Sequence, residues 1–384
     1  MRFIHTSDWH LGRQFHNVSL LEDQQHVLQQ LISYIEEEAV DALIIAGDIY
    51  DRSVPPAAAV KLLDEVLNQL CSILHVPVIM IPGNHDSAAR LRFGSRQLQQ
   101  SGLHIVTSLE HISRPVVLSG QKSGSDVEVN FYAIPYNDPE MVRHHFDADV
   151  STHDEAHQYL FKKIHKVIND QSVNVIISHC YLDGAEATES ERPLSIGGAD
   201  RVSFASFLPF DYAALGHLHS PQYKEAEHIR YSGSILKYSF SEQQQKKGVY
   251  LVDMGKSGLL QTTHLPLKPL RDMRVIEGEM KTIIEQGRFD PHAHDYLMVR
   301  LTDTHAILDA MGKLREIYPN VMHLEKTGIM HQHAQQNMHK DKLRHSELAM
   351  FRDFFIQVSG HELTREQDRA LQKIINSLHK SGDQ

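Results

Sequence analysis

The chain has 384 residues, of which 41% are hydrophobic and 23% charged, so it is expected to fold into two or three domains, and disorder and collagen-like repeats are excluded. Its formal net charge of −11 excludes a generally basic nucleic-acid coat and a polybasic membrane anchor, so any contact with DNA must be local. With two cysteines, no apolar leader and no apolar run near the roughly 20 residues of a membrane helix, we expect a cytoplasmic protein that spans no membrane.

Short β-branched runs and longer segments of helical period alternate in the first hundred residues, as in a sheet flanked by helices. The expected elements there are strands at 3–6, 43–46 and 78–81 and helices at 20–38 and 56–74. Further along, the sequence predicts a helix at 154–169 and strands at 104–107, 115–118, 127–134, 173–178, 211–215, 229–233, 248–253 and 259–265. So many antiparallel-looking strands exceed one doubly wound sheet, and we expect an α/β sandwich of two packed sheets with helices outside.

A connector around Pro266 and Pro269 indicates a domain boundary. Beyond it, a strand at 295–301, a helix at 305–317 and a strand at 321–326 predict a small α+β domain. A Gln-, His- and Lys-rich stretch then leads to two expected helices, at 346–359 and 364–379. We therefore divide the chain into a large domain, a small cap domain and a C-terminal helix pair, at 1–275, 276–340 and 341–384.

Clusters of metal-ligand residue types follow five of the predicted strands. Each cluster alone is a weak signal, because Asp-x-His arises by chance and a Ser-His pair is more often a satisfied buried histidine. Together they are a strong signal, because the carboxyl ends of neighbouring strands converge on one rim of a sheet. The candidate ligands in these clusters are Asp8, His10, Asp48, Asn84, His179, His217 and His219.

This set of side chains is too large for one ion. Two divalent ions bridged by a carboxylate would use all of it, and a mixture of imidazole and carboxylate without thiolate favours manganese, iron or zinc over calcium. His85 and Asp51 also lie in these clusters but are not needed as metal ligands. A histidine beside a metal ligand can protonate a leaving oxygen, and a carboxylate such as Asp51 can fix its tautomer. A solvated loop carboxylate next to Arg52 is the competing interpretation of Asp51.

Two further features have both a functional and a structural explanation. Arg90, Arg92 and Arg96 follow the Gly-Asn-His-Asp turn and could present guanidinium groups to phosphates, but an exposed charged helix face explains them at least as well. An apolar stripe that includes Phe351, Phe354 and Phe355 runs along the first terminal helix. It could fold back on the large domain or dock on another protein, and the sequence alone leaves these close to even.

The ordered set Asp-x-His, Gly-Asp-x-x-Asp, Gly-Asn-His-Asp, His and Gly-His-x-His resembles the calcineurin-like metallophosphoesterase superfamily. Within it, segments 5–12, 190–201, 231–239 and 351–355 resemble the SbcD family, the nuclease subunits of bacterial SbcCD complexes. The resemblance covers nearly the whole chain and shows no departure at the metal positions.

This resemblance implies a particular assignment of roles. One metal would be held by Asp8, His10, Asp48 and His219, and the other by Asp48, Asn84, His179 and His217. His85 would be catalytic and Asp51 would support it, while Phe351, Phe354 and Phe355 would contact the coiled-coil ATPase SbcC. The resemblance further implies manganese dependence, a homodimer, and exonuclease and endonuclease action on DNA in repair and recombination.

The same ligand set could serve a phosphatase or phosphodiesterase that acts on another substrate. The chain beyond residue 275 favours the nuclease, because a minimal phosphatase has no obvious need for a cap and an apolar terminal helix pair. A non-catalytic end-binding protein would not need His85 and Asp51, and a metallo-β-lactamase-type hydrolase would want an Asp and a His soon after His219.

Overall fold

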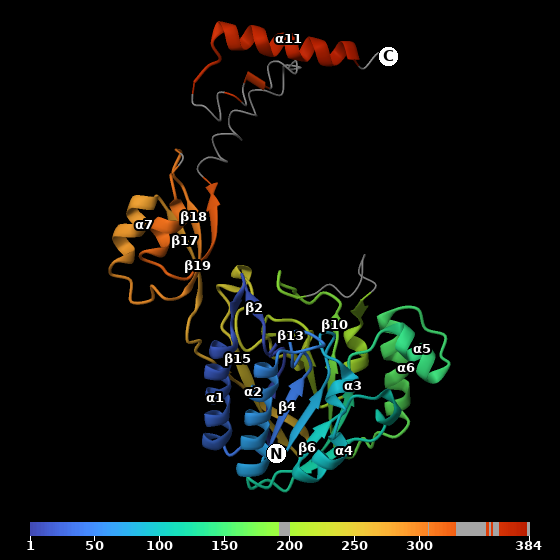
Figure 1. Ribbon diagram of the computed structural model, residues 1–384. Coiled ribbons are helices and arrows are strands. Elements are labelled where there is room, and N and C mark those ends of the chain that lie inside the picture. Colours follow the sequence, from blue (N-terminus) through green and yellow to red (C-terminus); the bar gives the residue numbers. More distant parts are fainter. Residues whose placement is uncertain (192–199, 306, 328–350, 353–354, 356–360, 382–384) are drawn as a thin grey trace.

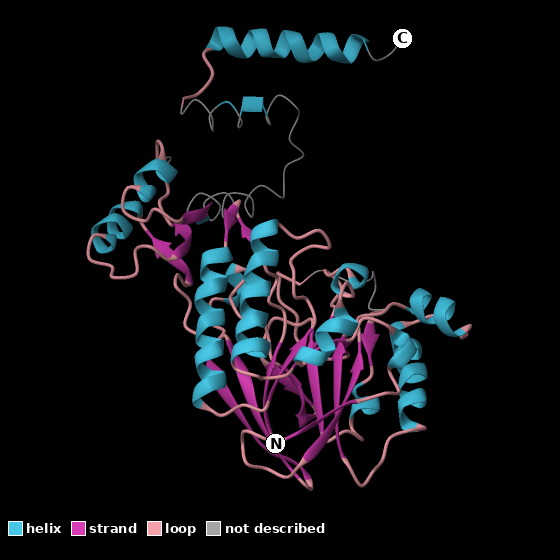
Figure 2. Cartoon of the chain, turned by 60° about the horizontal axis from the view of Figure 1, so that its bottom comes forward, coloured by secondary structure: helices cyan, strands magenta, loops and turns pink. Residues whose placement is uncertain are grey.

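The computed structural model describes residues 1–191, 200–305, 307–327, 351–352, 355 and 361–381. Two six-stranded sheets pack face to face, and the longer helices lie on the outside of this sandwich (Figures 1 and 2). The predicted two-sheet α/β sandwich is thereby confirmed. Among the described residues, no helix combines the length and apolar character needed to cross a bilayer.

The first sheet has the strand order β16-β15-β1-β4-β5-β6. Its parallel strands are β1 (Arg2–Thr6), β4 (Ala42–Ala46), β5 (Val78–Ile81) and β6 (Leu103–Ile105), and its antiparallel strands are β15 (Gly248–Gly255) and β16 (Gly258–Pro266). Helices α1 (Leu21–Glu37) and α2 (Ala57–Leu67) cover the outer face, and α2 continues as a π-helical turn over Asn68–Ile73. The predicted helix at 56–74 therefore changes its hydrogen-bond pattern partway along.

The second sheet has the strand order β13-β14-β12-β9-β8-β7. Its strands are β7 (Val116–Ser119), β8 (Glu128–Ile134), β9 (Val173–His179), β12 (Tyr212–Gly216), β13 (Gln222–Lys224) and β14 (Ala226–Tyr231). On its outer face lies α6 (His153–His165), which begins at a capping box formed by Thr152 and Glu155. Helix α5 (Pro139–Phe146) flanks α6.

Large side chains fill the space between the two sheets. Phe3 of β1 meets Phe131 of β8 and Tyr212 of β12 edge to face, with ring centroids 5.4 and 5.7 Å apart. Such contacts between fully buried rings fix how the two sheets sit on each other. The carboxyl ends of β1, β4, β5, β9 and β12 consequently meet at one end of the sandwich.

Several short elements have no clear sequence periodicity and were not predicted, because two to six residues cannot display one. They are β2 (Gln14–Phe15), β3 (Val18–Ser19), α3 (Ala88–Leu91), α4 (Ser95–Leu98), β10 (Tyr181–Leu182), β11 (Arg201–Val202) and β13 (Gln222–Lys224). Short 3-10 turns cover Gln99–Ser101, Leu109–His111, Phe204–Phe207 and Phe240–Glu242.

The small domain is a three-stranded parallel sheet in the order β17-β18-β19 with two helices. Its elements are β17 (Met273–Gly278), α7 (Met280–Gly287), β18 (Tyr296–Leu301), α8 (Ala310–Arg315) and β19 (Val321–Lys326). The predicted boundary between residues 275 and 276 is wrong by a few residues, because it cuts β17, which pairs with β18 from Met273 onward. The strand β17 was not predicted, since it follows the connector directly.

The C-terminal part is described only in pieces. Helix α11 (Arg365–Ser381) corresponds to the helix predicted at 364–379, and Figure 1 draws it apart from the two domains. Most of the helix predicted at 346–359, including Phe354, lies outside the described residues. Arg352 donates two hydrogen bonds of 2.6 Å to the Asp368 carboxylate and so ties this segment to α11.

Candidate metal centre

The seven predicted ligands come together at the end of the sandwich where the parallel strands finish. Asp8 and His10 follow β1, Asp48 follows β4 and Asn84 follows β5, so these four belong to the first sheet. The three remaining histidines follow or end β9 and β12 of the second sheet. Every one of the seven except Asn84 is at most 4% exposed. The structure therefore brings all of them into one buried centre between the two sheets.

Asp48 lies in the middle of this centre. Its Oδ2 is 3.5 Å from Nε2 of His10 and 3.6 Å from Nε2 of His179. On one side, Nε2 of His10 lies 3.1 Å from Nε2 of His219. On the other side, Oδ1 of Asn84 lies 3.1 Å from Nε2 of His179 and 3.1 Å from Nδ1 of His217. Asp48 is thus shared by two groups of ligand atoms.

Asp8 completes the arrangement. Its carboxylate lies within 4.8 Å of the ligand nitrogens of His10 and His219, and also within that distance of Asp48 and His179. A buried carboxylate in reach of both groups fits a centre for two closely spaced cations. We call Asp8, His10, Asp48 and His219 the first group and Asp48, Asn84, His179 and His217 the second, the division that the family resemblance implies, although Asp8 lies within reach of both.

The protonation of the imidazoles suits a metal. Burial lowers the pKa of His10 and of His219 well below the usual value, and lowers that of His217 to about 3, so all three are neutral. Nδ1 of His179 lies 2.9 Å from the carbonyl of Ala46, which directs Nε2 toward Asp48 and Asn84. Imidazole nitrogens that converge with carboxylate and amide oxygens form a donor set that fits two divalent ions.

Metal binding at this centre should depend on pH. Burial opposes the positive charge of His179, but the Asp48 carboxylate outweighs it and raises the pKa of His179 to about 9. Burial also raises the pKa of Asp8 to about 8. Below these values a metal must displace protons, so we expect the affinity for divalent metal ions to fall as the pH drops below about 8. Titration calorimetry in two buffers of different ionisation enthalpy measures the proton release, and a pH-independent affinity would contradict it.

The loops that carry the ligands have unusual backbone conformations. Asp8, His10 and Asp48 have positive φ angles of 53°, 45° and 49°. Backbone hydrogen bonds hold them there, with the amide of Asp8 donating to the carbonyl of Gly47 at 3.0 Å. Gly47 itself has a φ of 93°, and a Cβ there would clash with Nδ1 of His179. Only glycine fits before Asp48, which explains the Gly-Asp pair in the sequence.

His85 lies beside the first group of ligands, but its support differs from the prediction. Its Nδ1 is 2.8 Å from the backbone carbonyl of Asp51, and its backbone amide donates to Oδ1 of Asp48 at 2.9 Å. The Asp51 carboxylate instead lies 3.4 Å from Arg13 and 3.6 Å from Nδ1 of His10. The hydrogen bond between His85 and Asp51 is therefore made by the main-chain carbonyl, while the Asp51 carboxylate lies within 4.8 Å of a ring nitrogen of His85. That this carboxylate fixes the tautomer stays a prediction.

Sequence reasoning missed a buried polar network behind His219. Nδ1 of His219 lies 2.5 Å from Oγ of Ser190, which in turn donates to Glu242 at 2.5 Å. Glu242 is 0% exposed and forms a 2.6 Å ion pair with Lys247. The chain from Glu242 through Ser190 keeps the proton on Nδ1 of His219 and leaves Nε2 for a metal. Ser190 lies in a segment quoted for the family resemblance, but nothing in the sequence placed Glu242 behind it.

A second residue without a predicted role is Asp86. Its carboxylate accepts hydrogen bonds from the backbone amides of Ile49, Tyr50 and Gly83, at 2.9 to 3.0 Å. Asp86 therefore links the loop after β4 to the loop after β5 by hydrogen bonds, and so fixes the position of Asp48 relative to Asn84. The sequence feature that could have indicated this role is its position as the last residue of Gly-Asn-His-Asp.

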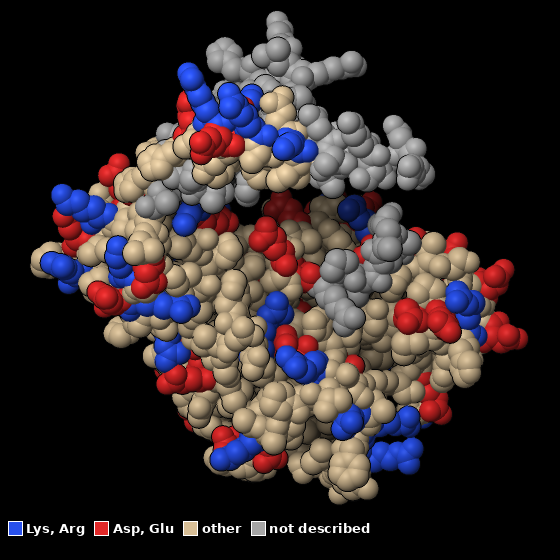
Figure 3. Space-filling model, turned by 45° about the horizontal axis from the view of Figure 1, so that its top comes forward, with Lys and Arg blue, Asp and Glu red and all other residues tan. Residues whose placement is uncertain are grey.

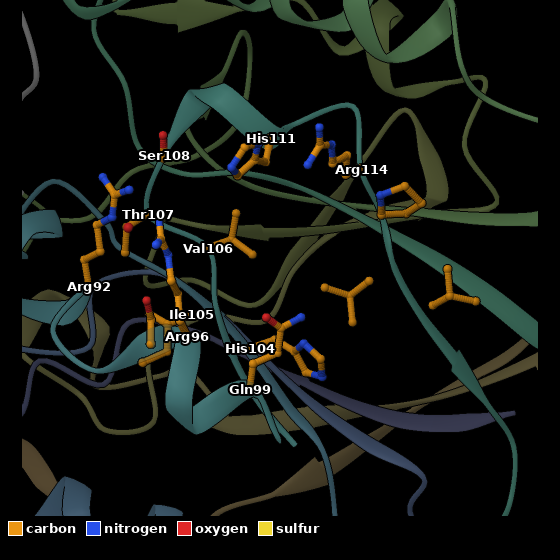
Figure 4. Close-up of a pocket in the computed structure, with 14 residues that line it drawn as sticks. Arg92, Arg96, Gln99, His104, Ile105, Val106, Thr107, Ser108, His111 and Arg114 are labelled. Atoms are coloured by element: carbon orange, nitrogen blue, oxygen red, sulfur yellow. The ribbon is translucent and has the colours of Figure 1, made fainter. Parts of the chain in front are cut away.

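The predicted DNA-binding arginines do not all lie together. Figure 3 shows Lys and Arg scattered among acidic side chains, without a continuous basic strip on that face. Arg92 and Arg96 line a pocket of about 490 Å³ that also contains Arg114, His104 and His111 (Figure 4), whereas Arg90 does not line it. The pocket lies at the edge strands β6 and β7 of the two sheets, and no acidic side chain lines it.

Comparisons with known proteins identify the family of this chain. The family model for calcineurin-like phosphoesterases matches residues 1–221, and the SbcD_C model, described as the type 5 capsule protein repressor C-terminal domain, matches residues 269–359. The SbcD subunit of the nuclease SbcCD from Staphylococcus epidermidis is 36% identical over 98% of this chain and 99% of its own length. The protein of the same name from Staphylococcus saprophyticus is 36% identical over the full length of both chains.

Among solved structures, a dimetal phosphatase from Danio rerio has a TM-score of 0.38 at 12% identity, covering 70% of this chain and 99% of that one, a similarity too low to carry an argument. The family assignment rests on the full-length identity and on the two family models. The chain belongs to the calcineurin-like phosphoesterases and, within them, to the SbcD family of nuclease subunits.

Proposed function

We propose that this metal-dependent phosphodiesterase is a DNA nuclease that degrades duplex ends and cuts hairpin or single-stranded DNA, as the catalytic subunit of an SbcCD-type complex in DNA repair and recombination. The observation that carries the proposal is the buried pair of ligand groups that share Asp48, with His85 beside them. The two staphylococcal relatives, both named as the SbcD subunit of the nuclease SbcCD, support the choice of DNA and of an SbcC partner. Manganese is the ion that we propose, because the ligands mix imidazole, carboxylate and amide oxygen without thiolate.

The residues divide the work of phosphodiester hydrolysis. Two divalent ions at the centre supply Lewis acidity and lower the pKa of water. Asp48 and Asp8 hold the ions in place and offset their charge, since both carboxylates are buried among the ligand nitrogens. His85 has its Nδ1 fixed by the Asp51 carbonyl, so its Nε2 is left to give a proton to the departing sugar oxygen. The buried histidines exclude bulk water from the ions.

A direct assay tests this function. Purified protein with manganese or magnesium is offered blunt duplex, hairpin and single-stranded DNA, together with a phosphomonoester. We expect manganese-dependent cleavage of DNA and little hydrolysis of the monoester. Rapid hydrolysis of the monoester with uncut DNA would support a phosphatase instead. Sedimentation analysis of the same sample tests the homodimer that the family resemblance implies.

We further propose that the pocket at the edge of the sandwich contacts the DNA backbone. Arg92, Arg96 and Arg114 have no ion-pair partner within the described part of the chain, and in a protein of net charge −11 such a group of cations is an exception. Guanidinium groups without carboxylate partners are free to pair with phosphates. The contacts would be to the backbone, so sequence preference should be weak.

Replacing Arg92, Arg96 and Arg114 together by alanine should weaken duplex binding. If all three meet phosphates, the slope of log K against log salt should become shallower by roughly 3, at about 0.9 per phosphate contact. Hydrolysis of a small phosphodiester should not change. Arg90→Ala is the matched control, because Arg90 is a nearby arginine outside the pocket lining. An equal effect of Arg90→Ala, or no change in the triple variant, would contradict the assignment.

The C-terminal segment is proposed as the site that binds SbcC. Phe351 is 44% exposed, and Figure 1 draws α11 apart from both domains, which supports a role in docking for the described part of this segment. We propose Phe351 and Phe355 as anchors of the interface, because buried aromatics carry much of the energy of such contacts. Phe354 is proposed with them from the sequence stripe alone.

Replacing Phe351 and Phe355 by glutamate should abolish co-purification with SbcC. The melting temperature and the manganese-dependent activity of the isolated protein should stay nearly unchanged, since the large domain is untouched. Leu308→Glu serves as the control, because Leu308 is an 87% exposed apolar residue of the small domain. If the double variant melts much earlier without any partner, the stripe belongs to the core of this protein.

A further inference from the structure

The first turn of α1 lies between the small domain and the metal centre. Two consecutive residues of this turn, Asp23 and Gln24, are 1% and 0% exposed. The polar side chain of each is therefore buried, and hydrogen bonds to Oδ2 of Asp23 and to the Gln24 amide offset much of the cost of burial. Asp23 makes its hydrogen bonds to the small domain, and Gln24 makes its hydrogen bonds to the loop that carries a metal ligand.

Asp23 binds the small domain. Its Oδ2 accepts hydrogen bonds from Nη1 of Arg271 and from the hydroxyl of Tyr296, both at 2.8 Å. Arg271 also pairs with Glu22 of the same turn, and its Nη1 donates to the Tyr296 hydroxyl at 3.1 Å. Arg271 precedes β17 and Tyr296 begins β18, so this cluster holds the base of the small domain against α1.

Gln24 binds the loop that carries His10. Its Nε2 donates to the carbonyl of His10 at 2.8 Å and to that of Trp9 at 3.0 Å, and its Oε1 accepts from the amide of Gly12 at 3.0 Å. One side chain thus fixes three points of the turn between β1 and β2. A shift of the first turn of α1 would therefore move the ligand His10.

A second contact between the domains leads to the other histidine of the same group. The backbone amide of Val275 in β17 donates to Oε1 of Gln243 at 3.2 Å. Gln243 is the neighbour of Glu242, which holds His219 through Ser190. These two of the contacts between the domains thus lead to the metal group that contains His10 and His219. In the other group, the carbonyl of Ala46 holds Nδ1 of His179, and Asn84 lies in the loop that the Asp86 carboxylate holds in place. Ala46 and Asp86 both belong to the large domain.

We propose that docking of the small domain positions His10 and His219, so that the small domain controls the metal affinity of the first group of ligands and leaves the second group unaffected. The inference rests on the proposed function, in which both groups hold catalytic ions. Asp23, Gln24 and Arg271 are positioning residues, because none of them touches a ligand atom.

Manganese binding to the full chain tests this coupling. Asp23→Asn and Arg271→Gln should each lower the manganese affinity of one of the two sites and leave that of the other unchanged. The expected loss is on the order of tenfold, as when a residue that hydrogen-bonds to a metal ligand is removed. Calorimetry and electron paramagnetic resonance measure the two sites without any turnover. Hydrolysis of bis(p-nitrophenyl) phosphate should lose kcat rather than KM, and excess manganese should restore it.

Arg274→Gln is the matched control. Arg274 pairs with Asp290 and Asp295 inside the small domain, so its loss disturbs that domain without touching α1. Equal weakening of both manganese sites, unchanged binding at both, or the same loss in Arg274→Gln would overturn the proposal. A failure of the proposed nuclease function would appear separately, as wild-type protein that binds two manganese ions and leaves DNA uncut.

Discussion

Replacing His85 by asparagine should reduce DNA cleavage by about 10²- to 10⁴-fold while both metal ions stay bound, because that is the usual contribution of a proton donor to a leaving group. The backbone amide of residue 85 donates to Oδ1 of Asp48 whatever its side chain, so the bridging carboxylate keeps this partner. Metal content and single-turnover cleavage of the same preparation measure the two effects. Loss of metal in this variant would make His85 a ligand and remove its role as proton donor.

Asp51→Ala gives a contrast that follows from the structure. The hydrogen bond that orients His85 is accepted by the carbonyl of residue 51, which alanine retains. The variant loses only the carboxylate near Arg13 and His10. We therefore expect a much smaller loss of cleavage than for His85→Asn. Equal losses would mean that the carboxylate reaches His85 during the reaction.

The sequence allowed the sandwich and the ligand set to be predicted together. Each ligand directly follows a strand, and parallel strands place their carboxyl ends on one edge, so chain order was enough to bring Asp48 near His10 and Asn84. The Gly-Asp and Gly-Asn pairs were also informative, because only glycine tolerates the close approach of the loops there. These features depend on local order along the chain.

The parts that could not be predicted depend on contacts between distant segments or on the main chain. Glu242 reaches His219 only because residues 190 and 242 are adjacent in the folded chain. A Glu and a Lys five residues apart look like an ordinary exposed pair, yet both are buried here and form a 2.6 Å ion pair with each other. The carbonyl of Asp51 has no sequence signature, since every residue has one.

The domain boundary failed for a related reason. β17 carries a short alternating run directly after a proline-rich connector, and its partner β18 lies more than twenty residues later. Parallel pairing across such a distance is not visible in local periodicity. The docking of Arg271 on Asp23 spans most of the chain, and only the folded arrangement brings the two together.

Asp48→Ala should have the largest effect on the metal centre. Oδ2 of Asp48 lies 3.5 and 3.6 Å from nitrogens of the two ligand groups, so its loss removes a ligand from both sites at once. It also removes the negative charge that offsets two neighbouring divalent ions, which would then repel each other in a buried site. We expect the metal content after gel filtration to fall from two ions per chain toward none, and manganese-dependent cleavage to fall to background.

Asp8→Ala is the informative comparison, because Asp8 is the other carboxylate within reach of both groups. If Asp48 bridges and Asp8 belongs to one group, the Asp8 variant should retain the ion held by Asp48, Asn84, His179 and His217. Elemental analysis of both variants then separates the roles of the two carboxylates. Two ions retained in Asp48→Ala, together with none in Asp8→Ala, would make Asp8 the bridge, and the division of the seven ligands between the two metals would have to be redrawn around it.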